Sequence, residues 1–469
     1  MKRNLTFVVA VWMALSAWVT TQVWAQHATP LQSDGSSQAS DAQRIEHVIL
    51  VSVDGLMPEA YMHPEAHGLK IPTLREIVRN GAYSEGARSV FPTMTYPAHS
   101  TIATGANPGT HGITMNQAWD PMEKNQEGWR WYAEDFRVPP IWEVARRAGL
   151  KTALVWWPVT VGAKATAVMP EIWRASTPED AKLARALATP GLLEEVEKRH
   201  PDFRSRFNPP GVKDDAVTDI ATYLIETMKP SLLMVHMFEV DHWQHEEGLY
   251  SKEAVEAIEN ADAQIARLIT AAKQAGTWEK TALVVVSDHG FARTTKRVKL
   301  GILLVQKGLV TLDDRNRVKS WKATVITGGG SAFFYLKDRN DQQTRDALKE
   351  MLKEVVRKKD GGVGRLYTQE EIRALGGDRD AVMAAEASEG YAMSWGYTGE
   401  YIADARNKAA HGYDPRRADM QASLLVYGPG IAPGKIEGAR LIDVAPTVAR
   451  WLGLKMKKTE GKAIEILEK

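Results

Sequence analysis

Three apolar runs in the chain each lead into residues that bind metals, and this pattern limits the folds that the chain can adopt. The first run, HVILVSVDG, ends at Asp54. The second leads to Asp241 and His245, and the third, TALVVVSDHG, ends at Asp288 and His289. A short run rich in Val, Ile and Leu that stops at a turn signal is typical of a buried parallel strand. Ligands in open α/β sheets bind beyond the carboxyl ends of such strands, so these five side chains are predicted to meet at one edge of one sheet.

Strand-like and helix-like segments alternate from Ile45 onward. This alternation predicts an α/β fold with a mostly parallel central sheet and helices on both faces. The predicted strands cover residues 47–54, 151–157, 231–237, 281–288, 332–336 and 422–427. Residues 361–407 carry many charges and glycines and only a weak strand signal, so they form either a small inserted cap or a long surface excursion. The expected organisation is one catalytic domain over residues 45–469.

Charge and cysteine content exclude several classes of partner and site. The formal net charge is +1 and no long basic block occurs, so neither a nucleic-acid polymer nor an anionic membrane surface is indicated as a partner. The chain has no cysteine, which rules out disulfides and thiolate metal sites. Any metal must therefore be held by Asp, Glu and His.

The first 25 residues resemble a secretory signal peptide. A basic head at Lys2 and Arg3 precedes an apolar stretch, and small residues at Val23 and Ala25 suit cleavage before Gln26. An uncleaved membrane anchor is the alternative, since a span needs about 20 apolar residues. The polar residues at 20–22 interrupt the run and favour cleavage. We expect a periplasmic or secreted protein in which residues 26–44, rich in Ser, Gln and Ala, form a flexible lead-in.

Carboxylate and imidazole side chains are suitable zinc ligands, and the chain offers them in close pairs. Asp241 and His245 are four residues apart, and Asp288 and His289 are adjacent. Each pair alone occurs more often in a turn or a helix cap than in a metal site. Their joint occurrence at strand ends favours a metal site, and this many ligands can hold two ions.

A segment rich in hydroxyl groups lies between the first and second of these runs. Thr95 stands between Pro92 and Pro97, just before a run that has the pattern of a helix start. A hydroxyl held near a metal ion can lose its proton and act as a nucleophile. The alternative interpretation is an ordinary Thr-rich turn.

Five motifs in order resemble those of the alkaline phosphatase superfamily. They are VSVDG, PTMTYPAHSTIATG with HGI after it, EVDHWQHEEG, SDHGF and HGYDP. Within that superfamily the chain is similar to the nucleotide pyrophosphatase/phosphodiesterase (type I phosphodiesterase) family, from about Ile45 to Leu454.

The resemblance implies an alkaline-phosphatase-like fold with two zinc ions per chain. The ligands that it implies for one ion are Asp241, His245 and His411. Those that it implies for the other are Asp54, Asp288, His289 and the hydroxyl of Thr95. The resemblance also implies that Thr95 is the nucleophile and becomes phosphorylated during turnover.

One departure from the family concerns the group that holds the phosphate. The family's nucleophile motif usually continues Thr-Phe-Pro-Asn, and that Asn donates to a phosphate oxygen, whereas this chain has Ala98. We expect Asn116, 21 residues after Thr95, to replace it as a substrate-binding residue. Trp119 is the candidate aromatic contact for a planar substrate group, with core packing as the alternative.

The sequence thus predicts an exported two-zinc hydrolase that cleaves phosphodiester or pyrophosphate bonds in small, nucleotide-type substrates. A phosphomonoesterase or phosphonate hydrolase on the same metal core is one alternative. A zinc-dependent binding protein without activity is another. A sulfatase is disfavoured, because that branch needs a Cys or Ser in a C/S-x-P-x-R motif and this chain has no cysteine. No sequence feature bears on the oligomeric state.

Overall fold

Strands β1, β5 and β6 lie side by side and in parallel, so their carboxyl ends meet at one edge of the sheet. In the computed structural model, β1 (His47–Val53) pairs with β5 (Leu232–Met237) on one side and with β6 (Thr281–Val286) on the other. The structure describes residues 45–468 except 123, 125–127, 173–177 and 208–211. The predicted signal peptide (1–25) and lead-in (26–44) lie outside the described residues. The described strands and helices belong to one unit, residues 43–469.

These three strands belong to an eight-stranded central sheet with the order β18-β2-β17-β6-β1-β5-β3-β4. The other members are β2 (Ala82–Tyr83), β3 (Thr152–Val155), β4 (Ala167–Met169), β17 (Leu424–Tyr427) and β18 (Gly434–Lys435). Only β17 runs antiparallel to its neighbours, β6 and β2. The prediction of a mostly parallel central sheet is therefore confirmed.

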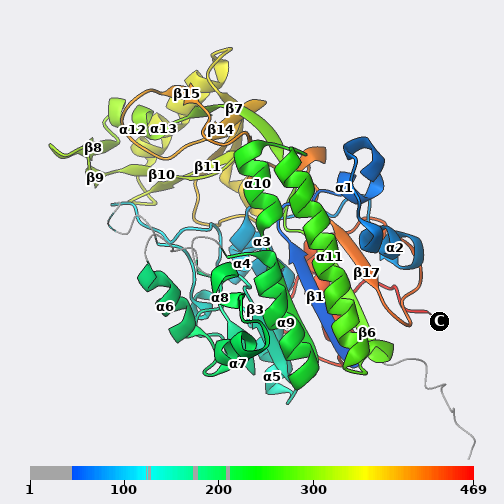
Figure 1. Ribbon diagram of the computed structural model, residues 1–469. Helices are drawn as coiled ribbons and strands as arrows, with labels where there is room; N and C mark the ends of the chain where they lie inside the picture. Colours follow the sequence, from blue (N-terminus) through cyan, green and yellow to red (C-terminus); the bar gives the residue numbers. More distant parts are fainter. Residues whose placement is uncertain (1–44, 123, 125–127, 173–177, 208–211, 469) are drawn as a thin grey trace, which may run out of the picture. The chain divides into compact units, whose positions relative to one another are not determined.

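Helices cover both faces of this sheet. Successive residues of the central strands point to opposite faces, and apolar side chains on both faces are buried against helices. Val51 of β1 packs into one buried cluster, together with α2 (Pro72–Asn80), α9 (Asp214–Met228) and α11 (Lys252–Gln274). Leu50 packs into a second cluster. That cluster contains α3 (Thr95–Thr104), α5 (Ile141–Arg147) and α15 (Val444–Trp451). Figure 1 shows α9 and α11 in front of β1. Each fully buried Val, Leu or Ile contributes about 1.5–3 kcal/mol to stability.

A second sheet is antiparallel, and its strands lie in the chain between β6 and β17 of the central sheet. Its order is β10 (Ala323–Gly328), β11 (Ser331–Leu336), β13 (Met383–Ala387) and β12 (Val363–Thr368). Helix α13 (Gln342–Arg357) packs against one face, where Phe334 is buried. Phe333 points to the opposite face and packs against Phe91 and Met115, which flank α3 and α4. The predicted strand 332–336 thus belongs to this sheet and not to the central one.

A third sheet is built around the strand that comes after His289. Strand β7 (Ala292–Val298) follows His289 directly and pairs with β14 (Gly390–Met393), β15 (Ile402–Asp404) and β16 (Ala409–Ala410). Residues 361–407 therefore contribute β12 and β13 to the second sheet and β14 and β15 to the third.

Helix α10 (Glu239–Glu247) follows β5, and α14 (Gln369–Ala374) follows β12. The remaining α-helices and strands are α1 (Glu59–Met62), α4 (Pro108–His111), α6 (Pro178–Leu187), α7 (Leu192–Arg199), α8 (Phe203–Arg206), α12 (Gly301–Gln306), β8 (Val310–Leu312) and β9 (Val318–Trp321). Within the described part of the chain, no helix combines the length and the apolar character that a membrane span requires.

Candidate metal centre and active site

A cavity of about 490 Å³ lies where β1 and β5 end, and several of the predicted site residues line it. Asp54, Thr95, Asp241 and His411 all contribute to its wall. Thr95 is the first residue of α3, and its side chain is largely buried. The hydroxyl nominated as nucleophile therefore shares one cavity with ligand-type side chains from three distant segments.

Helix α10 carries Asp241 and His245 one turn apart, so both side chains lie on the same face. The helix begins just after β5, and its first N–H groups are capped from another helix. The Asp214 carboxylate accepts hydrogen bonds from the backbone N–H groups of Phe238 (2.9 Å) and Glu239 (3.2 Å). This cap fixes the start of α10 against α9 and thereby the position of both ligand-type side chains.

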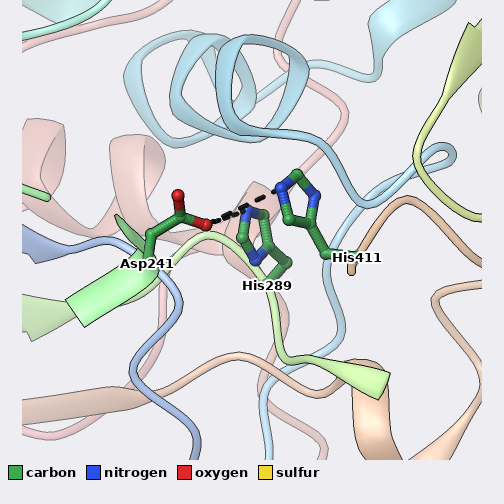
Figure 2. Close-up of side chains that lie close together, drawn as sticks. All are labelled: Asp241, His289 and His411. Carbon is green, nitrogen blue, oxygen red and sulfur yellow. Dashed lines mark ion pairs between the residues drawn. The ribbon is translucent and has the colours of Figure 1, made fainter. Parts of the chain in front are cut away.

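The ligand-type side chains form two groups that share His289. In the first group, shown in Figure 2, the Nε2 atoms of His411 and His289 lie 3.7 and 4.0 Å from Asp241 Oδ1. In the second, His289 Nε2 lies 3.0 Å from Asp288 Oδ2 and 3.3 Å from Asp54 Oδ1. The donor atoms within each group all lie within 4.8 Å of one another. The groups are therefore adjacent parts of one centre.

The three imidazoles of this centre are oriented in the same way. His245 Nε2 also points at Asp241, with 3.5 Å to Oδ1. In each ring Nδ1 lies within hydrogen-bond distance of a backbone carbonyl. The carbonyls belong to Ala409 for His245 (2.8 Å), Gly290 for His289 (3.2 Å) and Thr93 for His411 (2.9 Å). A proton on Nδ1 leaves the lone pair on Nε2, which is the tautomer that a metal-binding histidine needs.

Several buried side-chain atoms of the centre that could bind a metal have no hydrogen-bond partner among the described residues. They are Asp54 Oδ1, Asp241 Oδ1, Asp288 Oδ2 and His289 Nε2. Burial, followed by the charges of Asp288 and Asp241, raises the pKa of Asp54 well above its usual range. Buried carboxylates this close together repel one another unless a cation lies between them. Oxygen and imidazole donors without thiolates suit zinc, so these residues could hold divalent metal ions.

Another buried histidine, His236, holds one of the ligand-type carboxylates of the centre. His236 donates through Nε2 to Asp54 Oδ2 (2.9 Å) and through Nδ1 to the Glu171 carboxylate. Burial lowers the pKa of His236, but the carboxylates of Glu171 and Asp54 outweigh it and hold this pKa well above its usual range. The ring therefore fixes one oxygen of Asp54 and leaves the other facing His289.

Asn116 lines the same cavity, whereas Ala98 does not. The backbone N–H of Tyr96 donates to the Asn116 side chain at 2.9 Å, which identifies the accepting atom as Oδ1 and leaves the Nδ2 amide as a donor. Ala98 is a residue of α3, and its side chain is fully buried in the core. The missing amide at position 98 thus removes no donor from the cavity wall.

The structure does not bring Trp119 into this cavity. Trp119 lines a neighbouring cavity and is 43% exposed, whereas Trp129 lines the cavity that contains Thr95. Sequence reasoning also missed His236 and Glu171. A signal for His236 was present, because an imidazole in the middle of the apolar strand LLMVHM must find a buried partner.

A parallel sheet with carboxylate and imidazole donors at its strand ends, and a threonine hydroxyl beside them, defines a metal-dependent hydrolase of phosphoric esters with an alkaline-phosphatase-like fold. The chain belongs to the type I phosphodiesterase/nucleotide pyrophosphatase family, whose model matches residues 48–414. This match confirms the family resemblance seen in the sequence motifs.

Two human relatives show how far the similarity extends. Ectonucleotide pyrophosphatase/phosphodiesterase family member 1 is 24% identical over 269 residues, which cover 56% of this chain and 25% of that protein. Bis(5'-adenosyl)-triphosphatase ENPP4 is 22% identical over 437 residues, which cover 92% of this chain and 83% of that protein. The chain therefore matches a quarter of the first relative and most of the second.

Solved structures of ectonucleotide pyrophosphatase/phosphodiesterase 5 share the fold. The human protein superimposes with a TM-score of 0.64 at 20% identity, covering 89% of this chain and 97% of that chain. An inactive murine variant in complex with AMP gives a TM-score of 0.61 at 21% identity, with the same two coverages.

Proposed function

We propose that the protein is an exported two-zinc hydrolase that cleaves phosphodiester or pyrophosphate bonds of nucleotide-type substrates through a phosphothreonine intermediate on Thr95. The observation that carries this proposal is the position of Thr95 in one cavity with Asp54, Asp241 and His411. The family match supports the bond type. A relative named as a bis(5'-adenosyl)-triphosphatase and a structural neighbour with bound AMP support the substrate class.

We assign the metal ligands according to the family pattern. One zinc ion would be held by Asp241, His245 and His411. The other would be held by Asp54, Asp288, His289 and the hydroxyl of Thr95. When bound, two such ions supply positive charge that lowers the pKa of an attacking hydroxyl and stabilises the leaving oxygen. The unpartnered donor atoms and the common Nδ1 orientation of the three imidazoles support this assignment.

Thr95 performs the first step. Its Oγ1 gives up its proton and bonds to phosphorus while the bond from phosphorus to the leaving oxygen breaks on the opposite side, and the leaving oxygen takes up a proton from solvent. Water then attacks the phosphothreonine, the bond from phosphorus to Thr95 breaks, and the hydroxyl regains its proton. The Nδ2 amide of Asn116 donates to a non-bridging phosphate oxygen throughout, and Tyr96 N–H keeps that side chain in place.

A substrate panel tests this function. We expect the zinc-loaded protein to hydrolyse bis(p-nitrophenyl) phosphate and a dinucleotide faster than p-nitrophenyl phosphate or phosphonoacetate. EDTA and Thr95→Ala should each remove the activity. A preference for the monoester or the phosphonate would replace the proposal with the corresponding alternative. Zinc binding without hydrolysis of any substrate would indicate a binding protein.

We also propose that the mature protein is periplasmic or secreted and begins at Gln26. The basic head, apolar stretch and small residues before Gln26 support this. Intact-mass measurement of the protein exported by its own cell would give the start of the mature chain. A mass that includes residues 1–25 would instead support a retained anchor.

A further inference from the structure

A second cavity, of about 590 Å³, lies on the other side of the segment that carries Asn116. Asn116 faces the first cavity, whereas its neighbours Met115 and Gln117 line the second. The adjacent segment also lines both cavities, since Trp129 lines the first and Arg130 lines the second.

These two segments are paired and form a wall between the cavities. The backbone N–H of Arg130 donates to the carbonyl of Asn116 (2.9 Å), and that of Ala118 donates to the carbonyl of Gly128 (2.7 Å). Residues 114–119 and 128–130 form this wall. A ligand in the second cavity would contact the reverse side of the wall that holds Asn116 beside Thr95.

The second cavity has an excess of positive charge. Its cationic lining residues are Arg130, Arg137, Lys337, Arg339 and Arg379, and its acidic ones are Asp378 and Asp380. Five cations facing two acids in one cavity favour an anionic ligand.

The acids of the cavity do not neutralise two of its five cations, Arg137 and Lys337. Asp380 is paired with Arg339 at 3.0 Å. Asp378 Oδ2 accepts hydrogen bonds from the hydroxyl groups of Thr114 (3.1 Å) and Tyr335 (2.9 Å). Within the part of the chain that the structure describes, Arg137 and Lys337 have no ion pair with an acidic side chain. Their charges are therefore available to a ligand that enters the cavity.

An aromatic wall lies beside this charge. Trp119 is 43% exposed, which is unusual for so large an apolar side chain. Two other lining aromatics hold it in edge-to-face contact, with ring centroids 4.6 Å away for Tyr335 and 6.1 Å away for Trp321. The exposed part of the indole, held by these two contacts, offers the cavity an aromatic surface beside the cations.

We propose that the second cavity is a binding site, distinct from the metal centre, for a small aromatic anion that carries a phosphate group, of which a nucleoside monophosphate is representative. The phosphate binds Arg137 and Lys337, and the planar ring stacks on Trp119. This site is additional to the proposed hydrolysis and does not depend on it.

Equilibrium dialysis with AMP tests the site directly. Zinc-loaded Thr95→Ala protein serves as the parent, so that bound nucleotide is not turned over. Adding Arg137→Ala and Lys337→Ala should remove one equivalent of bound AMP or weaken that equivalent at least ten-fold. A matched pair of exposed cations on helices away from both cavities, Arg146→Ala and Lys349→Ala, should leave binding unchanged. Equal stoichiometry and affinity in parent and cavity variant would overturn the proposal.

Two further probes separate the charged and aromatic contacts. Inorganic phosphate should lose affinity in the Arg137→Ala/Lys337→Ala variant, whereas adenosine should not. Trp119→Ala should weaken AMP more than inorganic phosphate. Equal weakening of adenosine and AMP by the double substitution would overturn the proposed charged contact. The single substitution Lys337→Gln repeats the test if the double variant fails to fold, and retained zinc content reports folding without using activity.

Discussion

Asn116 can offer only one of its two amide atoms to a substrate, because the Tyr96 N–H holds the other. Replacing Asn116 by Asp keeps the acceptor for Tyr96, removes the donor and adds a negative charge facing the phosphate. A hydrogen bond to a charged group contributes about 1.5–3 kcal/mol, so we expect kcat/KM to fall by at least about 10–100-fold. Steady-state kinetics on the preferred diester measures this effect.

The control for this substitution is Asn80→Asp, which makes the same charge change at an exposed position at the end of α2. It should leave kcat/KM unchanged. Unaltered kinetics in Asn116→Asp would show that the amide does not contact the phosphate.

His236 forms a hydrogen bond with Asp54, and Glu171 forms one with His236. The loss of either residue should therefore weaken metal binding. Partners of this kind typically change metal affinity by about 10–100-fold. We expect this loss of zinc affinity in His236→Asn and a smaller loss in Glu171→Gln, measured by competition with a chromogenic chelator. His47→Asn replaces a half-buried histidine at the amino end of β1, away from the centre, and should retain the parent affinity. Unchanged affinity in all three variants would show that the buried pair has no role in metal binding.

At the level of elements, α4 holds α3 through a buried histidine. His111, the last residue of α4, lies 3.0 Å through Nε2 from Thr101 Oγ1, and its Nδ1 accepts from the Ile113 N–H at 3.1 Å. Burial, together with Arg137, lowers the pKa of His111 to about 3 from 6.5. The neutral ring is thus the form that connects α4 to the helix that begins with Thr95.

This shift predicts acid sensitivity. Below about pH 6.5 the unfolded chain binds a proton at His111 that the folded chain does not bind until about pH 3. The stabilisation is therefore complete above pH 6.5 and is lost as pH falls, with a slope of about 1.4 kcal/mol per pH unit. Urea unfolding from pH 7 to pH 4.5 should show a shallower decline in His111→Asn than in the parent. Equal slopes would contradict the buried neutral state.

The strands that carry the centre were predictable, whereas some connecting elements were not. Apolar runs bounded by polar turns gave β1, β5 and β6, because burial on both faces leaves a continuous apolar signature. Strand β16 has two residues and leaves no pattern, so spacing alone could not place His411 beside Asp241. The family resemblance nominated His411, and the pairing of β16 with β7 provides the physical reason for its position.

At the level of the whole molecule, the antiparallel second sheet was the least predictable part. The strand over residues 331–336 was visible as an apolar run. It forms a hairpin with the adjacent residues 323–328 and also pairs with residues 383–387, which lie much later in the chain. The second, distant pairing depends on how side chains pack and not on local pattern. Trp119 packs against this sheet, with its ring in contact with Tyr335 of β11, so its placement could not be predicted before the sheet was known.

Removal of metal should destabilise the protein as a whole. Asp54, Asp241 and Asp288 then face one another without a cation, and any ligand that binds only the folded state adds to its stability. We expect EDTA to lower the melting temperature by several degrees. In the metal-free state, Asp54→Asn should melt above the parent, because the substitution removes one of the mutually repelling carboxylates. If the metal-free and the zinc-loaded parent proteins have the same melting temperature, the proposed metal centre is contradicted.

The central claim is that Thr95 bonds covalently to the phosphorus of the substrate. Rapid acid quenching during the first turnover of bis(p-nitrophenyl) phosphate, followed by peptide mass spectrometry, tests it most directly. We expect a phosphoryl-type adduct on the peptide that contains Thr95, dependent on zinc and absent from Thr95→Ala. Turnover by Thr95→Ala at the parent rate, with no adduct on Thr95 in the parent, would contradict it.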